Sequence, residues 1–185
     1  MSKTAVVGRN VEVIQTGVGS SNRTAFSWSV VIAGALAAWA VSFIFITLGS
    51  GVGLVIASPF SGPSTGTMTI IGAIWLIIAQ TVAYTTGGYL AARLRIRDHI
   101  PGPETVFRDA AHGFMTWVVG VGVMSALLLL VGTMAHHDAQ TATTMTDEAR
   151  KAAAYFSFWS FVALLFGAVA GTLAGILGGE LRDEL

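Results

Sequence analysis

Long uncharged apolar segments alternate with short polar ones along this chain. Four of the apolar segments are predicted to be membrane-spanning helices, at about residues 26–48, 68–94, 108–134 and 152–179. A helix needs about 20 consecutive apolar residues to cross the hydrocarbon core of a bilayer, and each segment reaches that length. The pattern therefore predicts an all-α integral membrane protein folded as a four-helix bundle.

Lysine and arginine lie mainly on one side of these four segments. Eight of the ten fall in the N-terminal tail, in or next to the turn between the second and third segments, or after the fourth, and only Arg150 and Lys151 fall on the other side. Because Lys and Arg accumulate in cytoplasmic loops, we expect both termini in the cytoplasm. Residues 1–24 are predicted to be a flexible cytoplasmic tail, 25–180 the transmembrane domain and 181–185 a cytoplasmic C-terminus.

Small residues recur at every fourth position of the fourth segment, which places them on one face of a helix. In lipid, such a face lets a second backbone approach closely, so a glycine-zipper fourth helix is predicted. Two interpretations stay open: the face packs within the chain, or it binds a partner or a second copy. The predicted helix-packing residues are Ala163, Gly167, Gly171, Gly175 and Gly179, with a shorter patch at Gly34 and Ala38.

Glycines also follow the first segment directly, at Gly49, Gly51 and Gly53. The uncharged stretch continues beyond them to residue 57, which is longer than one upright helix needs. Glycines are common where helices bend or end, so we expect the first helix to break or bend at residues 49–53.

A faint internal repeat relates the ends of the second and fourth segments. Residues 88–95 read GYLAARLR and residues 175–182 read GILGGELR, and Thr85 and Thr172 stand at the same offset before them. The repeat favours two helical hairpins of the same orientation, related by an axis along the membrane normal. Chance similarity among helices rich in Gly, Ala and Leu explains the same pattern.

The most polar set inside the spans is Gln80, Thr81 and Tyr84. These side chains either bond to neighbouring helices or line a pore or small-molecule pocket. No Asp, Glu, Lys or Arg lies in the middle of a predicted span, which argues against proton-coupled pumps and voltage sensors but not against a passive pore.

Composition narrows the chemistry further. The chain is 54% hydrophobic and 11% charged, with no net charge and no cysteine. The absence of cysteine excludes thiolate nucleophiles and cysteine-ligated metals, and the neutral charge balance gives no indication of a nucleic-acid partner. The four histidines do not pair on facing spans as axial haem ligands would. No catalytic, cofactor-binding or metal-binding residues are predicted, and we expect no enzyme activity.

Basic residues gather at the cytoplasmic end of the second and third segments. One interpretation is a polar helix entry that neutralises itself, with Glu104 and Arg108 paired at i,i+4. The other is contact with anionic lipid headgroups, for which the residues would be Arg93, Arg95, Arg97, Arg108 and His112.

Three motifs carry a resemblance to a known family: GSGVGL at residues 49–54, GGYLAARLR at 87–95 and FRDAAHGF at 107–114. Over about residues 26–130 the chain resembles a family of small uncharacterised bacterial inner-membrane proteins, some of them labelled "PhnA-like". The resemblance implies a four-span protein of the bacterial inner (plasma) membrane and implies no activity. Nothing in these residues supports the phosphonate chemistry in that label.

The predicted function is that of a non-catalytic accessory or structural subunit. It would pack against a larger inner-membrane assembly, such as a respiratory or photosynthetic complex, or self-associate through its glycine-rich faces. The alternative is a passive channel or small-solute transporter formed by a homo-oligomer around the fourth helix or the Gln80 face.

Overall fold

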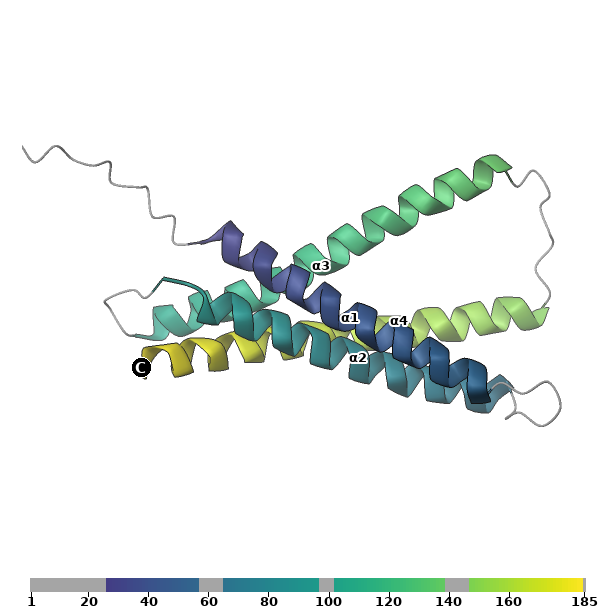
Figure 1. Ribbon diagram of the computed structural model, residues 1–185, viewed down its shortest axis with the longest axis horizontal. Helices are drawn as coiled ribbons and strands as arrows, with labels where there is room; N and C mark the ends of the chain where they lie inside the picture. The colour runs from purple at the N-terminus through teal and green to yellow at the C-terminus, as the bar shows by residue number, and fades with distance from the viewer. Residues whose placement is uncertain (1–25, 57–64, 97–101, 139–146, 185) are drawn as a thin grey trace, which may run out of the picture.

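The structure is a computed structural model that describes residues 26–56, 65–96, 102–138 and 147–184. These residues form four helices, and no strand occurs among them (Figure 1). The helices are α1 (Trp28–Ile56), α2 (Thr65–Arg93), α3 (Pro103–Asp138) and α4 (Asp147–Asp183). Each contains a stretch long and apolar enough to cross a membrane, so the predicted all-α architecture of a multi-pass membrane protein is confirmed.

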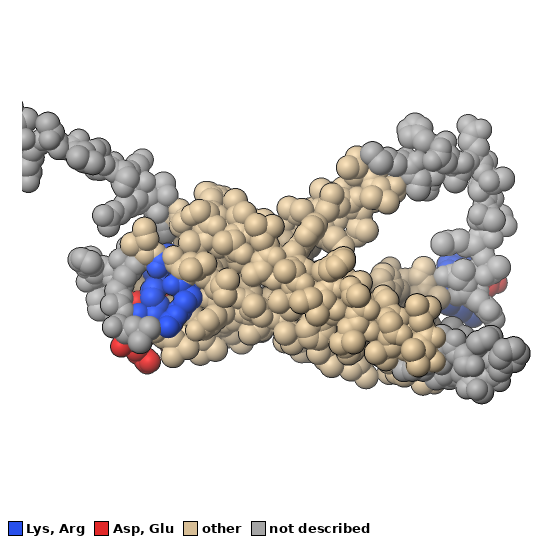
Figure 2. Space-filling view, viewed as in Figure 1, with Lys and Arg blue, Asp and Glu red and all other residues tan. Residues whose placement is uncertain are grey.

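The helices are joined into one bundle by the central pair α2 and α3. The most extensive interface is between α2 and α4, and α1 packs on α2 and α3 but does not contact α4 in the described part of the chain. We call the end where α1 and α3 begin and α2 and α4 finish the charged end, and the opposite end the open end. Basic side chains gather at the charged end in Figure 2, and a smaller group of them lies near the open end.

Close backbone contacts hold the charged half of the bundle together. A Cβ atom added to Gly88 of α2 or to Gly113 of α3 would overlap the carbonyl oxygen of Gly171 in α4, and one on Gly175 would lie 2.5 Å from the carbonyl oxygen of Asp109. Ala163 is fully buried as well. The small-residue face of α4 therefore packs within the chain, which decides between the two interpretations left open by the sequence.

The shorter patch on α1 is also internal. A Cβ on Gly34 would lie 2.5 Å from the carbonyl oxygen of Gly87, and one on Gly87 would lie 2.6 Å from that of Gly34. Ala38 beside this crossing is only 1% exposed. Both small-residue faces are thus occupied by contacts within the chain.

The predicted break in the first helix is wrong, because α1 continues through Gly49, Gly51 and Gly53 to Ile56. No glycine in the described residues has a positive φ. Gly49 has a packing role, since a Cβ there would collide with the indole of Trp75, whose Nε1 donates to the Phe45 carbonyl at 3.1 Å. In lipid there is no water to satisfy released backbone groups, so the helix persists where glycine would end it in water.

The open half is assembled differently. In Figure 1, α3 runs away from α1 and α4 towards its C-terminal end. Large apolar side chains are exposed on α3 and α4 in this half, and together they form what we call the open-end face. Its residues are Val123, Leu127, Leu128, Leu129, Leu130 and Val131 on α3, and Tyr155, Phe156, Phe158 and Phe161 on α4.

Candidate functional site

A buried cluster of charges joins three helices at the charged end. Asp109 of α3 is 2% exposed and accepts from both terminal nitrogens of Arg182, each at 3.2 Å. Its Oδ1 also lies 2.9 Å from Nε of Arg95, which follows the end of α2. Arg182 donates further to the carbonyl of Ala92 at 3.0 Å and to Asp183 at 2.9 Å. The cluster is a structural clamp, since every charged group in it is bound to another part of the protein.

Gly179 makes room for this clamp. A Cβ at Gly179 would overlap the carboxylate of Asp109, so only glycine lets the carboxylate reach Arg182 beside α4. Gly179 was predicted as a helix-packing position, and its packing partner is a charged side chain rather than a helix backbone.

The two arginines stand at matching positions of the internal repeat, the last residue of GYLAARLR and of GILGGELR. Both converge on the single carboxylate of Asp109. The relation between the halves is incomplete, because α2 contacts α3 whereas α1 and α4 do not touch within the described residues. The structural consequence of the repeat is therefore that its two equivalent arginines bind the same carboxylate at the charged end.

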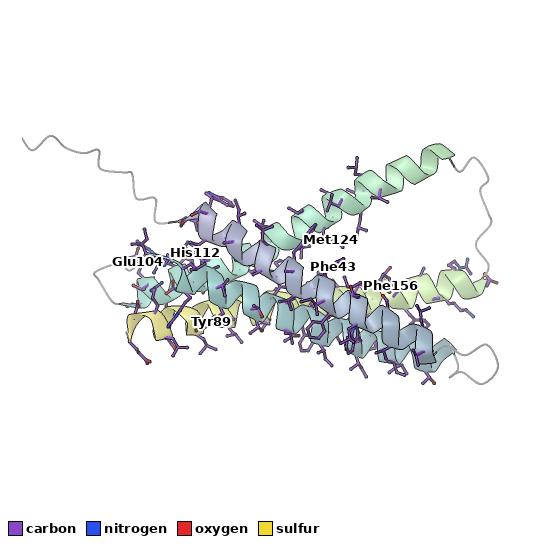
Figure 3. All side chains as sticks on the ribbon, viewed as in Figure 1. Phe43, Tyr89, Glu104, His112, Met124 and Phe156 are labelled. Carbon is purple, nitrogen blue, oxygen red and sulfur yellow. The ribbon has the colours of Figure 1, made fainter. Side chains whose placement is uncertain are left out.

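His112 is the second anchor at this end and is fully buried. Its Nε2 accepts a hydrogen bond from the backbone N–H of Ser27 at 3.1 Å, so the ring proton is on Nδ1, which donates to the Arg108 carbonyl at 2.6 Å. The ring of Phe26 stacks on it with centroids 4.5 Å apart. His112 thereby ties the start of α1 to α3, and Figure 3 shows it beside the first turns of α1.

The predicted lipid-headgroup site is wrong for two of its five members. Arg95 is 6% exposed and bound to Asp109, and His112 is fully buried, so neither can meet a headgroup. Arg108 is partly exposed and pairs with Glu104, and Arg93 is half-buried. Arg97 lies outside the described residues.

Replacing His112 with phenylalanine should loosen the start of α1 without disturbing the rest. Phenylalanine keeps an aromatic ring against Phe26 but cannot accept from the Ser27 N–H or donate to the Arg108 carbonyl of its own helix. Only the first of these bonds holds α1, and its loss costs about 1 kcal/mol. We expect faster amide hydrogen exchange at residues 27–31 by about five-fold. Val118→Ala, an exposed change on the same helix, should leave that exchange rate unaltered. Unchanged exchange in His112→Phe would show that His112 does not anchor α1.

The polar set inside the spans separates into three roles. The Thr81 hydroxyl donates to the Ile77 carbonyl of its own helix at 2.7 Å. Tyr84 is 5% exposed and packs on Gly120 of α3 and Gly167 of α4, where an added Cβ would lie 2.8 Å from the phenol in each case. Oε1 of Gln80 is buried and has no hydrogen-bond partner in the part of the chain that the structure describes.

Gln80 and Tyr84 also line a cavity of about 270 Å³ where α3 leaves the other helices. All four helices contribute to its wall, which is mostly apolar and aromatic with two serine hydroxyls. Figure 3 shows Phe43 and Met124, both from this wall, near the point of divergence. Its polar and aromatic lining residues include Trp39, Ser42, Phe43, Gln80, Tyr84 and Ser125.

Sequence reasoning found Gln80 and Tyr84 but missed Asp109 and Arg182 as a pair. The carboxylate of Asp109 binds Arg95 and Arg182, which lie on other parts of the chain and share no helix turn with it. The signal that could have found the clamp was the repeated Leu-Arg at residues 94–95 and 181–182. Among the described residues, no three His, Asp or Glu side chains come together as metal ligands would.

Comparison of the chain with protein-family models, with curated proteins and with solved structures gives no match.

Proposed function

We propose that this protein is a non-catalytic accessory subunit of a larger assembly in the bacterial inner membrane, with both termini in the cytoplasm. The observation that carries the proposal is the contrast between the two halves of the bundle. The charged half is closed by the Asp109 clamp and by backbone contacts at glycine, whereas the open half leaves α3 apart from its neighbours.

The open-end face has the character of an unfinished interface. Leu129 is 71% exposed on α3 and Phe156 is 67% exposed on α4. Lipid tails are as apolar as these side chains, so exposure to lipid alone carries little cost, and association there would come from van der Waals packing. A further span packed between the diverging ends of α3 and α4 would contact the exposed apolar side chains of both helices.

The alternative, a homo-oligomeric pore, would have to form on surfaces other than the small-residue face of α4. Gly171 and Gly175 contact other helices of the same chain, and Gln80 lines a cavity to which all four helices contribute. Replacing these glycines with leucine would disrupt the protomer itself before it could affect an oligomer. The accessory-subunit proposal needs none of these residues at the surface.

Photo-crosslinking tests the proposal directly. We would place p-benzoylphenylalanine at Leu129 on the open-end face and, as a matched control, at Leu173, which is 55% exposed on the closed half of α4. We expect Leu129, but not Leu173, to form an adduct with another integral membrane polypeptide. The same polypeptide should co-migrate with the unmodified protein, carrying an N-terminal tag, in mild detergent. Adducts with lipid alone at both positions, or only with a second copy of this chain, would contradict the proposal.

A further inference from the structure

The amide of Gln80 is out of place unless something pairs with it. Its Oε1 is buried without a hydrogen-bond partner among the described residues, and a buried polar group left unpaired costs about 1–3 kcal/mol. The neighbouring polar side chain Thr81 is satisfied within its own helix. Gln80 Oε1 and the indole Nε1 of Trp117 are both buried without a hydrogen-bond partner in the described part of the spans, and of the two residues only Gln80 lines a cavity.

The cavity beside Gln80 has room for one ring. Its volume of about 270 Å³ exceeds the roughly 150 Å³ of an apolar cavity that holds benzene, and falls just below the roughly 300–1,000 Å³ of sites for drug-sized ligands. Trp39, Phe43 and Tyr84 in the wall can stack on a ring or meet its edge. The lining selects a compact, uncharged, largely apolar molecule, because it contains no charged side chain.

The depth of Gln80 in the membrane limits which molecules can bring a polar group to its side chain. It lies 15 residues after the start of α2 and 13 before its end, which places it about 20 Å from either end of the helix. A phospholipid keeps its ester and headgroup oxygens near the membrane surface, and its acyl chain has no polar group to offer at this depth. The occupant must dissolve in the hydrocarbon layer as a whole.

We propose that this cavity binds an uncharged ring compound that carries a hydroxyl group and reaches it from the hydrocarbon layer. A hydroxyl both donates and accepts, so it can pair with the oxygen or the nitrogen of the Gln80 amide. The terminal torsion of glutamine is broad, and rotation about it brings either atom to the cavity. The ring fills the space between Trp39, Phe43 and Tyr84, in a cavity that is partly open where α3 diverges from the other helices.

The test uses two probes of almost the same shape, 4-bromophenol and 4-bromotoluene, which differ in a hydroxyl against a methyl group. Binding to the protein in phospholipid nanodiscs is followed by bromine quenching of tryptophan fluorescence, with Trp39→Phe to identify the signal from the cavity. We expect saturable quenching by both probes in the unmodified protein. In Gln80→Leu the affinity for bromophenol relative to bromotoluene should fall about five-fold, the value of one hydrogen bond.

Two further variants keep the result decisive. Thr81→Val removes a hydroxyl from the same helix but not from the cavity, so the probe ratio should stay as in the unmodified protein. Leu164→Phe adds a ring to the cavity wall and should abolish quenching by both probes. Non-saturable quenching that reflects partition into the bilayer alone, or an identical probe ratio in Gln80→Leu and the unmodified protein, would overturn the proposal. Neither result depends on whether a partner occupies the open-end face.

Discussion

Replacing Asp109 with asparagine is expected to destabilise the folded protein by about 3–5 kcal/mol. The change leaves the guanidinium groups of Arg95 and Arg182 buried beside each other without their shared carboxylate. These groups cannot be hydrated again unless the packing of α2, α3 and α4 opens. The cost of burying two unpaired charges therefore lowers the stability of the whole charged end. Reversible unfolding in mixed detergent and SDS micelles, followed by circular dichroism, measures the loss.

Glu104→Gln provides the matched control, since it also removes one carboxylate from α3. Its ion pair with Arg108 is solvent-facing, with the glutamate side chain 76% exposed, and such pairs contribute less than about 1 kcal/mol. If the two variants unfolded at the same SDS fraction, the clamp would not be what holds the three helices together.

Gly88→Ala should be the most damaging single-methyl change in α2, at about 3 kcal/mol. The new Cβ would overlap the carbonyl oxygen of Gly171. A backbone atom cannot rotate away as a side chain can, so relief requires α2 and α4 to move apart along their largest interface. We expect a lower unfolding midpoint. We also expect slower disulfide formation between a pair of cysteines introduced on the facing sides of the two helices.

Gly72→Ala is the control within the same helix. Nothing lies within 4 Å of the Cβ that it adds, and alanine favours the helix over glycine by up to about 1 kcal/mol. The two substitutions should therefore have opposite signs. Equal effects would mean that helix propensity, and not close approach, governs the glycines of this protein.

The architecture could be predicted because the length of an apolar segment decides whether it spans a bilayer. The end of α1 could not be predicted in the same way. In water, glycine weakens a helix because water can bond to the released backbone groups, and in lipid no water is there to do so. The direction of the α4 small-residue face was also beyond the sequence, since Gly171 offers the same flat surface to a neighbour in its own chain or in another. The structure shows the direction of this face, because Gly88 and Gly113 of the same chain lie against the backbone of Gly171.

The candidate site was partly visible in the sequence. Gln80 stood out as an amide in an apolar segment, and the structure adds the cavity, which exists because α3 diverges and therefore depends on packing far from residue 80. The Asp109 clamp joins residues 73 positions apart on α3 and α4, and no local rule pairs them. His112 looked like a surface residue because the burial that hides it comes from Phe26 and Ser27 at the start of α1.

The clamp also gives the protein a built-in order of completion. During synthesis the Arg95 guanidinium is made before Asp109, so the carboxylate has one partner as soon as α3 enters the membrane, and Arg182 arrives only after α4 has been threaded. Until that last turn is delivered, the end of α4 has no ionic hold on α3. Arg182 thus acts as a latch, and a chain truncated before residue 182 would keep the apolar span of α4 but lose its ionic contact with α3.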